Sequence, residues 1–170
     1  MRFILRAFWV ISFLGFLYNL FTTYGNLQQI LKIQIGSLAL SLTRSQFFFF
    51  FLIFFLIFNV ALYMYSKAIY SVPNKIFLVP FKSFWTSDKE NRRAANHILD
   101  AWTWAFACTV NYFLIFWMLV VENNFHFEGN TVSSVSWFYI PGLIMLASLI
   151  IPVFRLMVRN TNLLQRAERE

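Results

Sequence analysis

The sequence predicts an all-α fold, an integral membrane bundle of four transmembrane helices, and both its composition and its charge pattern lead to this prediction. Apolar residues make up 59% of the 170 residues and charged residues only 12%, whereas soluble domains have about 45–50% and about 25%. A soluble domain of this size needs more charge to cover its surface. The charges are also clustered, and they leave long apolar stretches between them.

Four of these stretches reach the length of about 20 mainly apolar residues that crosses a bilayer. They are 7–24, 46–66, 101–121 and 136–156. One such stretch can be a buried core helix, but four of them leave little chain to bury them. The sequence has no internal repeat and no flexible linker, so we expect a single domain over 1–170.

The first span has a second interpretation as a cleaved signal peptide, because Arg2 and Arg6 precede it. Its exit reads NLFTTYGN, without small residues at the paired positions that signal peptidase prefers. Phe, Trp and Tyr also recur through it. A retained helix is therefore the favoured interpretation.

Basic residues predict how the spans are oriented. Twelve of the fourteen Lys and Arg residues precede the first span, lie in the loop 67–97, or lie at the end of the fourth span and after it, and only Lys32 and Arg44 fall on the other side. Loops rich in Lys and Arg stay in the cytoplasm, so we expect both termini inside (N-in/C-in) and 67–97 as a cytoplasmic loop. The net charge of +7 then matches anionic lipid headgroups at that face, and it requires no nucleic acid.

Two capping-box patterns, a Ser or Thr followed three residues later by Glu or Gln, mark helix starts. Thr43–Gln46 precedes the second span, and Ser87–Glu90 lies in the cytoplasmic loop. From Asp88 a helix can continue without a breaker to Val121, which is about 50 Å at 1.5 Å per residue. We therefore expect helix three to extend into the cytoplasm.

Two segments leave alternatives open. The loop 25–42 is only weakly polar and contains LQQILKIQIGSLALSL, so it either lies on the membrane or forms a short strand pair. In the fourth span, Pro141 is either the first helical residue or a kink in a helix that starts earlier.

Asparagines inside the spans predict how the helices pack. Asn19, Asn59 and Asn111 lie in three different spans, and an amide buried in hydrocarbon needs a hydrogen-bond partner. Helix two runs inward and helix three outward, so Asn59 and Asn111 fall at the same depth. We expect these two amides to hydrogen-bond and to set the helix register. A substrate or ion site is the alternative for the three asparagines, but no ionisable residue accompanies them inside their spans.

Residue size predicts which helix faces lie inside the bundle. Packed faces in membranes favour small and polar residues, and bulky ones face lipid. The run QFFFFFLIFFLIFNV in the second span should therefore contact acyl chains, with some rings filling gaps between helices. The expected interior faces are Ser12, Gly15, Asn19 and Thr22 on helix one, and two adjacent stripes on helix three, Ala101, Ala105, Cys108 and Tyr112 beside Thr103, Ala107 and Asn111.

The first half of the cytoplasmic loop is aromatic and basic. Pro73 and Pro80 discourage a regular helix there, and bulky apolar side chains between lysines suit the lipid headgroup region. The candidate contacts to headgroups or to a partner protein are Lys75, Lys82, Trp85, Arg92 and Arg93.

Residue patterns for catalysis and for metal binding are missing from the sequence, which has no HExxH, GxSxG, Walker-type or CxxC motif. Cys108 is the single cysteine, and His97 and His126 fall on opposite sides of the predicted membrane. Asp100 and His97 are interpreted as a solvated helix start rather than a phosphate site. We therefore expect no enzyme activity, no cofactor and no metal.

A sequence pattern in the cytoplasmic loop consists of Pro73-Asn74-Lys75, Trp85 and the Arg92-Arg93 pair. It resembles the inner loop of uncharacterised bacterial multi-pass inner-membrane proteins, in which a Pro-Asn-Lys step after a helix leads to an aromatic stretch ending in Trp and then to an Arg-containing helix. The resemblance covers about a fifth of the chain and implies no activity. A His-containing extracytoplasmic motif of some relatives is absent before span two.

Two classes of function follow from these features. The first is a non-enzymatic membrane protein that scaffolds, assembles with or regulates a larger membrane complex. The second is a small oligomeric transporter, channel or lipid-handling protein that uses the polar helix faces. We expect a multi-pass protein of the bacterial cytoplasmic (inner) membrane, with the lipid bilayer and either a membrane protein or further copies of itself as partners.

Overall fold

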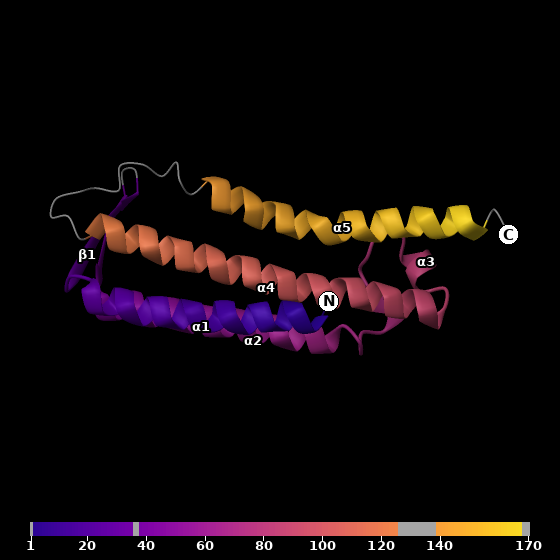
Figure 1. Cartoon of the computed structure of the whole chain (residues 1–170), viewed down its shortest axis with the longest axis horizontal. Coiled ribbons are helices and arrows are strands. Elements are labelled where there is room, and N and C mark those ends of the chain that lie inside the picture. The colour runs from indigo at the N-terminus through magenta and orange to yellow at the C-terminus, as the bar shows by residue number, and fades with distance from the viewer. Residues whose placement is uncertain (1, 36–37, 126–138, 168–170) are drawn as a thin grey trace.

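The computed structural model describes residues 2–35, 38–125 and 139–167, and within these ranges the chain is mostly helical, with one strand pair and short connecting turns (Figure 1). Three helices are long and apolar enough to cross a membrane, and they indicate a helical membrane protein. The elements in chain order are α1 (Arg2–Asn26), β1 (Ile30–Ile35), β2 (Leu38–Thr43), α2 (Arg44–Ala68), the 3-10 turn η1 (Asn74–Ile76), α3 (Lys82–Trp85), α4 (Lys89–Phe125) and α5 (Tyr139–Ala167), and the three long apolar ones are α1, α2 and α4.

Helix α4 is the centre of the bundle, with α1 and α2 on one side of it and α5 on the other (Figure 1). Helices α1 and α4 run parallel, whereas α2 and α5 run antiparallel to α4. Aromatic and aliphatic side chains fill the space between α1, α2 and α4. Phe16 and Phe55, both fully buried, stack with 4.1 Å between their ring centroids.

The start of α2 confirms the first capping box. Thr43 accepts a hydrogen bond from the Gln46 amide, and the Gln46 side chain accepts one from the Thr43 amide. The second box is wrong by one residue, because Asp88 caps α4 and its Oδ1 accepts from the amides of Glu90 and Asn91, at 2.7 Å each. A carboxylate is a good cap, since it also faces the positive end of the helix dipole. From Lys89 the helix continues unbroken to Phe125, as predicted.

The loop 25–42 contains a strand pair, the second of the two alternatives. Strands β1 and β2 are antiparallel, with Ile30 opposite Thr43 and Ile35 opposite Leu38. The pair therefore ends where α2 begins, so the residue that closes the ladder also caps the helix.

The phenylalanine run of α2 divides between lipid-exposed and buried faces, as its composition predicts. Phe47, Phe48 and Phe55 are buried, and Phe49 and Phe50 are more than half exposed. The two groups follow the helical period, so one face packs on α1 and α4 and the other faces outward.

Helix α5 is described from Tyr139, and residues 136–138 of the predicted fourth span lie outside the described residues. Pro141 falls in the first turn, where a missing backbone N–H leaves no hydrogen bond unmade. Among the residues whose side chains are described, the apolar segment of α5 is Gly142–Met157. Three candidate spans lie among the described residues, and the fourth span stays a prediction.

Helix α5 is also displaced along α4. The Trp102 indole N–H of α4 donates to the Ser148 carbonyl of α5 at 2.8 Å, which fixes their relative depth. At 1.5 Å per residue, Asn111 lies about 14 Å beyond Trp102, and Tyr139 lies the same distance beyond Ser148 in the same direction. The described start of α5 is therefore near the middle of α1 and α2, and its other half extends past their ends (Figure 1).

Candidate functional site

A polar layer joins α1, α2 and α4 near their middle, and we call it the amide layer (Trp9, Ser12, Asn59 and Asn111). The two amides exchange hydrogen bonds, from Asn59 Nδ2 to Asn111 Oδ1 at 3.1 Å and from Asn111 Nδ2 to Asn59 Oδ1 at 3.2 Å. Trp9 donates its indole N–H to Asn59 Oδ1 at 2.8 Å, and Asn111 Nδ2 donates to Ser12 Oγ at 3.1 Å. The predicted hydrogen bond between Asn59 and Asn111 is present, and Trp9 and Ser12 of α1 make further hydrogen bonds to these two amides.

The third predicted asparagine does not join this layer. Asn19 lies about 10 Å further along α1 than Ser12, and its buried Oδ1 has no partner among the described residues. The structure therefore brings two of the three asparagines together. Of the two predicted stripes on α4, Thr103, Ala107 and Asn111 are buried, whereas Tyr112 of the other stripe is 47% exposed and its predicted interior position is wrong.

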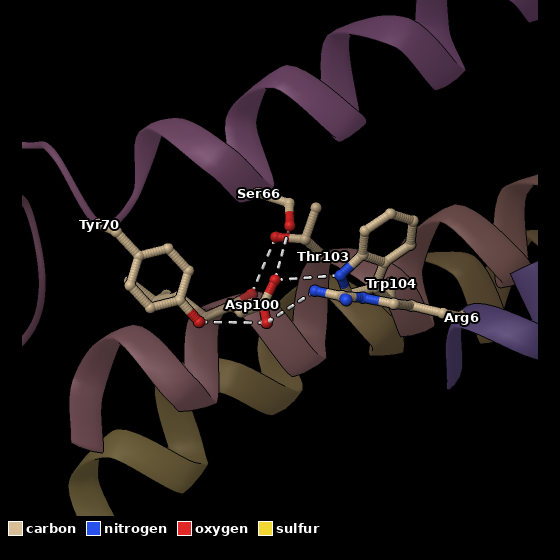
Figure 2. A network of polar contacts seen from close by, with 7 residues as sticks. Arg6, Ser66, Tyr70, Asp100, Thr103 and Trp104 are labelled. Carbon is tan, nitrogen blue, oxygen red and sulfur yellow. Dashed lines mark hydrogen bonds and ion pairs between the residues drawn. The ribbon is translucent and has the colours of Figure 1, made fainter. Parts of the chain in front are cut away.

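A second polar group lies at the end of the bundle where α1 begins and α2 ends, which we call the Asp100 end. Figure 2 shows its members around the fully buried Asp100 carboxylate. Oδ1 accepts from Ser66 Oγ at 2.6 Å and from the Trp104 indole at 3.0 Å, and Oδ2 accepts from the Tyr70 hydroxyl at 3.2 Å. Arg6 Nη2 lies 4.0 Å from Oδ2. We call Arg6, Ser66, Tyr70, Asp100 and Trp104 the Asp100 cluster.

The electrostatics of this cluster explain how a carboxylate tolerates complete burial. An unpaired buried charge is strongly unfavourable, and hydrogen bonds together with an opposite charge offset that cost. Arg6 is half-exposed, and its guanidinium lies 5.3 Å from the centroid of the Trp104 ring as well as near Asp100. Side chains of three helices, α1, α2 and α4, thus stabilise the charge of Asp100.

The prediction that Asp100 belongs to a solvated helix start is wrong, because its side chain is fully buried. His97, three residues earlier, is exposed and its ring lies beside Tyr70, with 6.5 Å between the ring centroids. The sequence contained a signal for this cluster. Asp100 and Trp104 share one helix face, and Ser66 and Arg6 lie at the ends of two apolar stretches, at the same depth as Asp100. His126 lies outside the described residues.

The candidate contact residues of the cytoplasmic loop fall into two groups. Trp85 is fully buried, and the Arg92 guanidinium carbon lies 3.3 Å from the centroid of the Phe77 ring while Nη2 donates to the Val72 carbonyl at 2.7 Å. Both side chains therefore hold the loop onto α4, and Trp85 as a headgroup or partner contact is a wrong prediction. The residues that remain outside are Lys75 and Arg93, which are exposed, and Lys82, which is half-exposed and donates from Nζ to the Lys75 carbonyl at 2.6 Å.

Both polar groups connect helices. Within residues 3–30, 41–122 and 142–157, whose side chains are described, no three His, Cys, Asp or Glu side chains gather as a metal site does. The Asp100 oxygens accept hydrogen bonds from hydroxyl and indole groups of two helices. These hydrogen bonds join α4 to α1 and α2 at two defined positions.

The fold and these two groups define the class, a helical membrane protein whose spanning helices are joined by buried polar side chains. Comparison with known proteins adds no closer assignment, since no family model, no curated protein and no solved structure matches the chain.

We predict that Asn59 and Asn111 stabilise the bundle cooperatively. A double-mutant cycle of Asn59→Leu and Asn111→Leu should give a coupling of about 0.5–2 kcal/mol in the free energy of unfolding, because each single change leaves the other amide short of a partner. Reversible unfolding in mixed micelles measures it, with the exposed Tyr112→Leu as control. Strictly additive single effects with an unchanged fold would contradict the pairing role.

We predict that Asp100→Leu lowers the free energy of unfolding by about 3–5 kcal/mol, the loss expected when one member of a buried charged group is removed. Asp100→Asn should lower the free energy of unfolding by less, since the amide carbonyl still accepts a hydrogen bond. The exposed Glu90→Gln on the same helix is the matched control. Equal stability of Asp100→Leu and the unaltered protein would show that the cluster contributes nothing to the fold.

Proposed function

We propose that the protein is a non-enzymatic integral membrane component that acts as a scaffold, assembly or regulatory subunit of a larger membrane complex. The observation that carries this proposal is the packing of α5, which among the described helices has α4 as its one substantial neighbour. Around α4, the amide layer and the Asp100 cluster are satisfied by side chains of α1 and α2. On the opposite side of α4, α5 leaves most of its apolar surface uncovered.

The packing of α5 supports a helical membrane protein as the partner. Among the described residues, α5 packs on α4 and has at most marginal contact with α1 and α2. Its buried and half-buried positions form a single strip, which consists of Gly142, Met145, Ser148, Pro152 and Leu156. Helices in lipid associate through close packing rather than through water exclusion, so a helix with one neighbour has faces free for another. The exposed apolar side chains of α5 are Leu143, Ile144, Leu146, Leu149, Ile150, Ile151, Val153, Phe154 and Met157.

The proposed location is a bacterial inner membrane, which the chain crosses four times with the Asp100 end in the cytoplasm. The distribution of Lys and Arg supports this orientation, and so does the resemblance of the loop around Pro73 and Trp85 to inner loops of bacterial membrane proteins. The start of α1 and the end of α5 lie toward the same end of the molecule (Figure 1), as an even number of crossings requires.

A second candidate function is a small oligomeric carrier, channel or lipid-handling protein, and Asp100 is the observation that favours it. Ionisable residues buried among membrane helices often mark ion pathways, and Asp100 has Arg6 beside it. We rank it second because the Asp100 oxygens already accept hydrogen bonds from Ser66, Tyr70 and Trp104.

We predict that the full-length tagged protein, purified from its own membrane in mild detergent, brings one membrane protein with it in fixed stoichiometry. Leu146→Trp on α5 should reduce the recovery of that protein, because the larger ring obstructs the free face. Ile57→Trp on the exposed face of α2 is the control and should not. Recovery of a homo-oligomer alone would contradict the scaffold proposal and favour the carrier.

We predict that both termini face the cytoplasm. Green fluorescent protein at either end should fluoresce, and alkaline phosphatase at either end should be inactive, since the first folds inside the cell and the second outside. An active phosphatase at the C-terminus with a fluorescent N-terminus would indicate three crossings and overturn the four-span proposal.

A further inference from the structure

We propose that the Asp100 end binds the headgroup region of an anionic lipid leaflet through an exposed apolar tip of the loop between α2 and α4. The tip consists of Ile76, Leu78 and Phe81, and Lys75 and Lys82 flank it. This inference rests on the proposed membrane orientation, and it adds a defined lipid contact to the proposed function.

The exposure of the tip is the first observation. Leu78 is 92% exposed, Ile76 65% and Phe81 51%. Phe81 also has a left-handed backbone with φ of 55°, which is rare for a bulky residue and persists where the surrounding structure holds it in place. The loop therefore presents large apolar side chains outward in a fixed conformation.

The loop is attached firmly to α4 beneath this tip. Between Ile76 and Leu78, the side chain of Phe77 points inward and is buried against the Arg92 guanidinium. Phe77 and the fully buried Trp85 belong to one apolar cluster with Leu99 of α4. Exposed and buried side chains thus alternate along 76–78. The exposure of Ile76 and Leu78 is therefore set by the folded conformation of the loop.

The loop that carries the tip is attached to α4 on the outer side of the hydrocarbon core. Asp100 marks the end of the three-helix unit, and the stretch of α4 from Asp100 to Val121 is about 30 Å long, the thickness of the hydrocarbon core. Arg92, which holds the loop, lies about 12 Å beyond Asp100 along α4. Leu156 of α5 is buried in the same cluster as Phe77, so the apolar surface of α5 reaches this depth as well.

The charges around the tip favour lipid over protein as its occupant. Lysine is depleted in the buried centres of protein interfaces, whereas at a membrane its stem lies along apolar groups and its ammonium contacts phosphate. Arg155 adds a further exposed cation on α5. The described acidic residues of this end are Asp88 and Glu90, which are exposed at the far tip of α4, and the buried Asp100.

Site-directed spin labelling of the full-length chain tests this lipid contact. Cys108→Ala removes the single cysteine, and a nitroxide is then attached through Leu78→Cys or, as control, through the exposed Glu90→Cys. The protein is placed at one copy per nanodisc in phosphatidylcholine with phosphatidylglycerol. We expect oxygen to relax the Leu78 label more than a water-soluble nickel chelate does, and the reverse for the Glu90 label.

A second measurement tests the charges. Lys75→Gln should lower the preference for phosphatidylglycerol over phosphatidylcholine, measured as lipid retained by the purified protein, by about fivefold, the effect of one cation near an anionic surface. Lys89→Gln removes an equally exposed charge further from the bilayer and should leave the preference nearly unchanged.

The possible outcomes separate this inference from the proposed function. A Leu78 label that the nickel chelate reaches in nanodiscs overturns the lipid contact, and protection that returns only in native membranes indicates a protein partner instead. Protection that requires two copies per disc overturns it in favour of self-association. Failure to recover a partner protein bears on the scaffold proposal alone, because the label is read on the purified chain.

Discussion

A polar side chain buried among membrane helices has no water to bond with, and this constraint determines how α1, α2 and α4 fit together. Asn111 of α4 satisfies it by bonding to Asn59 of α2 and Ser12 of α1. Asp100 satisfies it through Ser66 at the end of α2 and through Arg6 near the start of α1. The two sets of contacts lie about 16 Å apart along α4. Two fixed points define both the rotation and the axial position of each neighbouring helix.

Polar contacts and apolar packing have different roles in this bundle. A hydrogen bond between membrane helices contributes only about 0.6 kcal/mol on average, so the amide layer and the Asp100 cluster contribute specificity more than cohesion. The larger contacts are made by rings such as Phe16 and Phe55, which stack about one helical turn beyond the amide layer, on the side away from Asp100. Ring packing tolerates small shifts of one helix along another, whereas a network with defined donors and acceptors does not.

Local patterns predicted the features that depend on one helix or one depth. The capping box at Thr43, the unbroken α4 and the pairing of Asn59 with Asn111 follow from short-range spacing and from the direction of the helices. The burial of Asp100 did not, because it depends on where Ser66 of α2 and Arg6 of α1 meet α4.

Features that depend on three-dimensional docking were also missed. The sequence predicts Tyr112 in the interior of the bundle, because two adjacent stripes of α4 are equally suitable as its buried face. The side on which α1 docks decides between them. Trp85 was placed at the membrane surface because an aromatic and basic composition is the same for a loop folded onto a helix. The displacement of α5 along α4 could not be predicted from the sequence either. Hydrophobic spacing defines which face of a helix is buried, but it does not define the axial position of the helix relative to its neighbour.

The single strip of contact between α5 and α4 has a consequence for how the protein is made. Synthesis proceeds from the N-terminus, and the units that are complete fold first. Helices α1, α2 and α4 precede α5 in the chain and make their mutual contacts without it, so α5 is added to a core that does not need it for its polar contacts. Elements with few buried contacts open at the lowest free energy. Helix α5, which follows the other three long helices in the chain, is therefore also the one that detaches most readily, and quality-control proteases of the membrane would encounter it first.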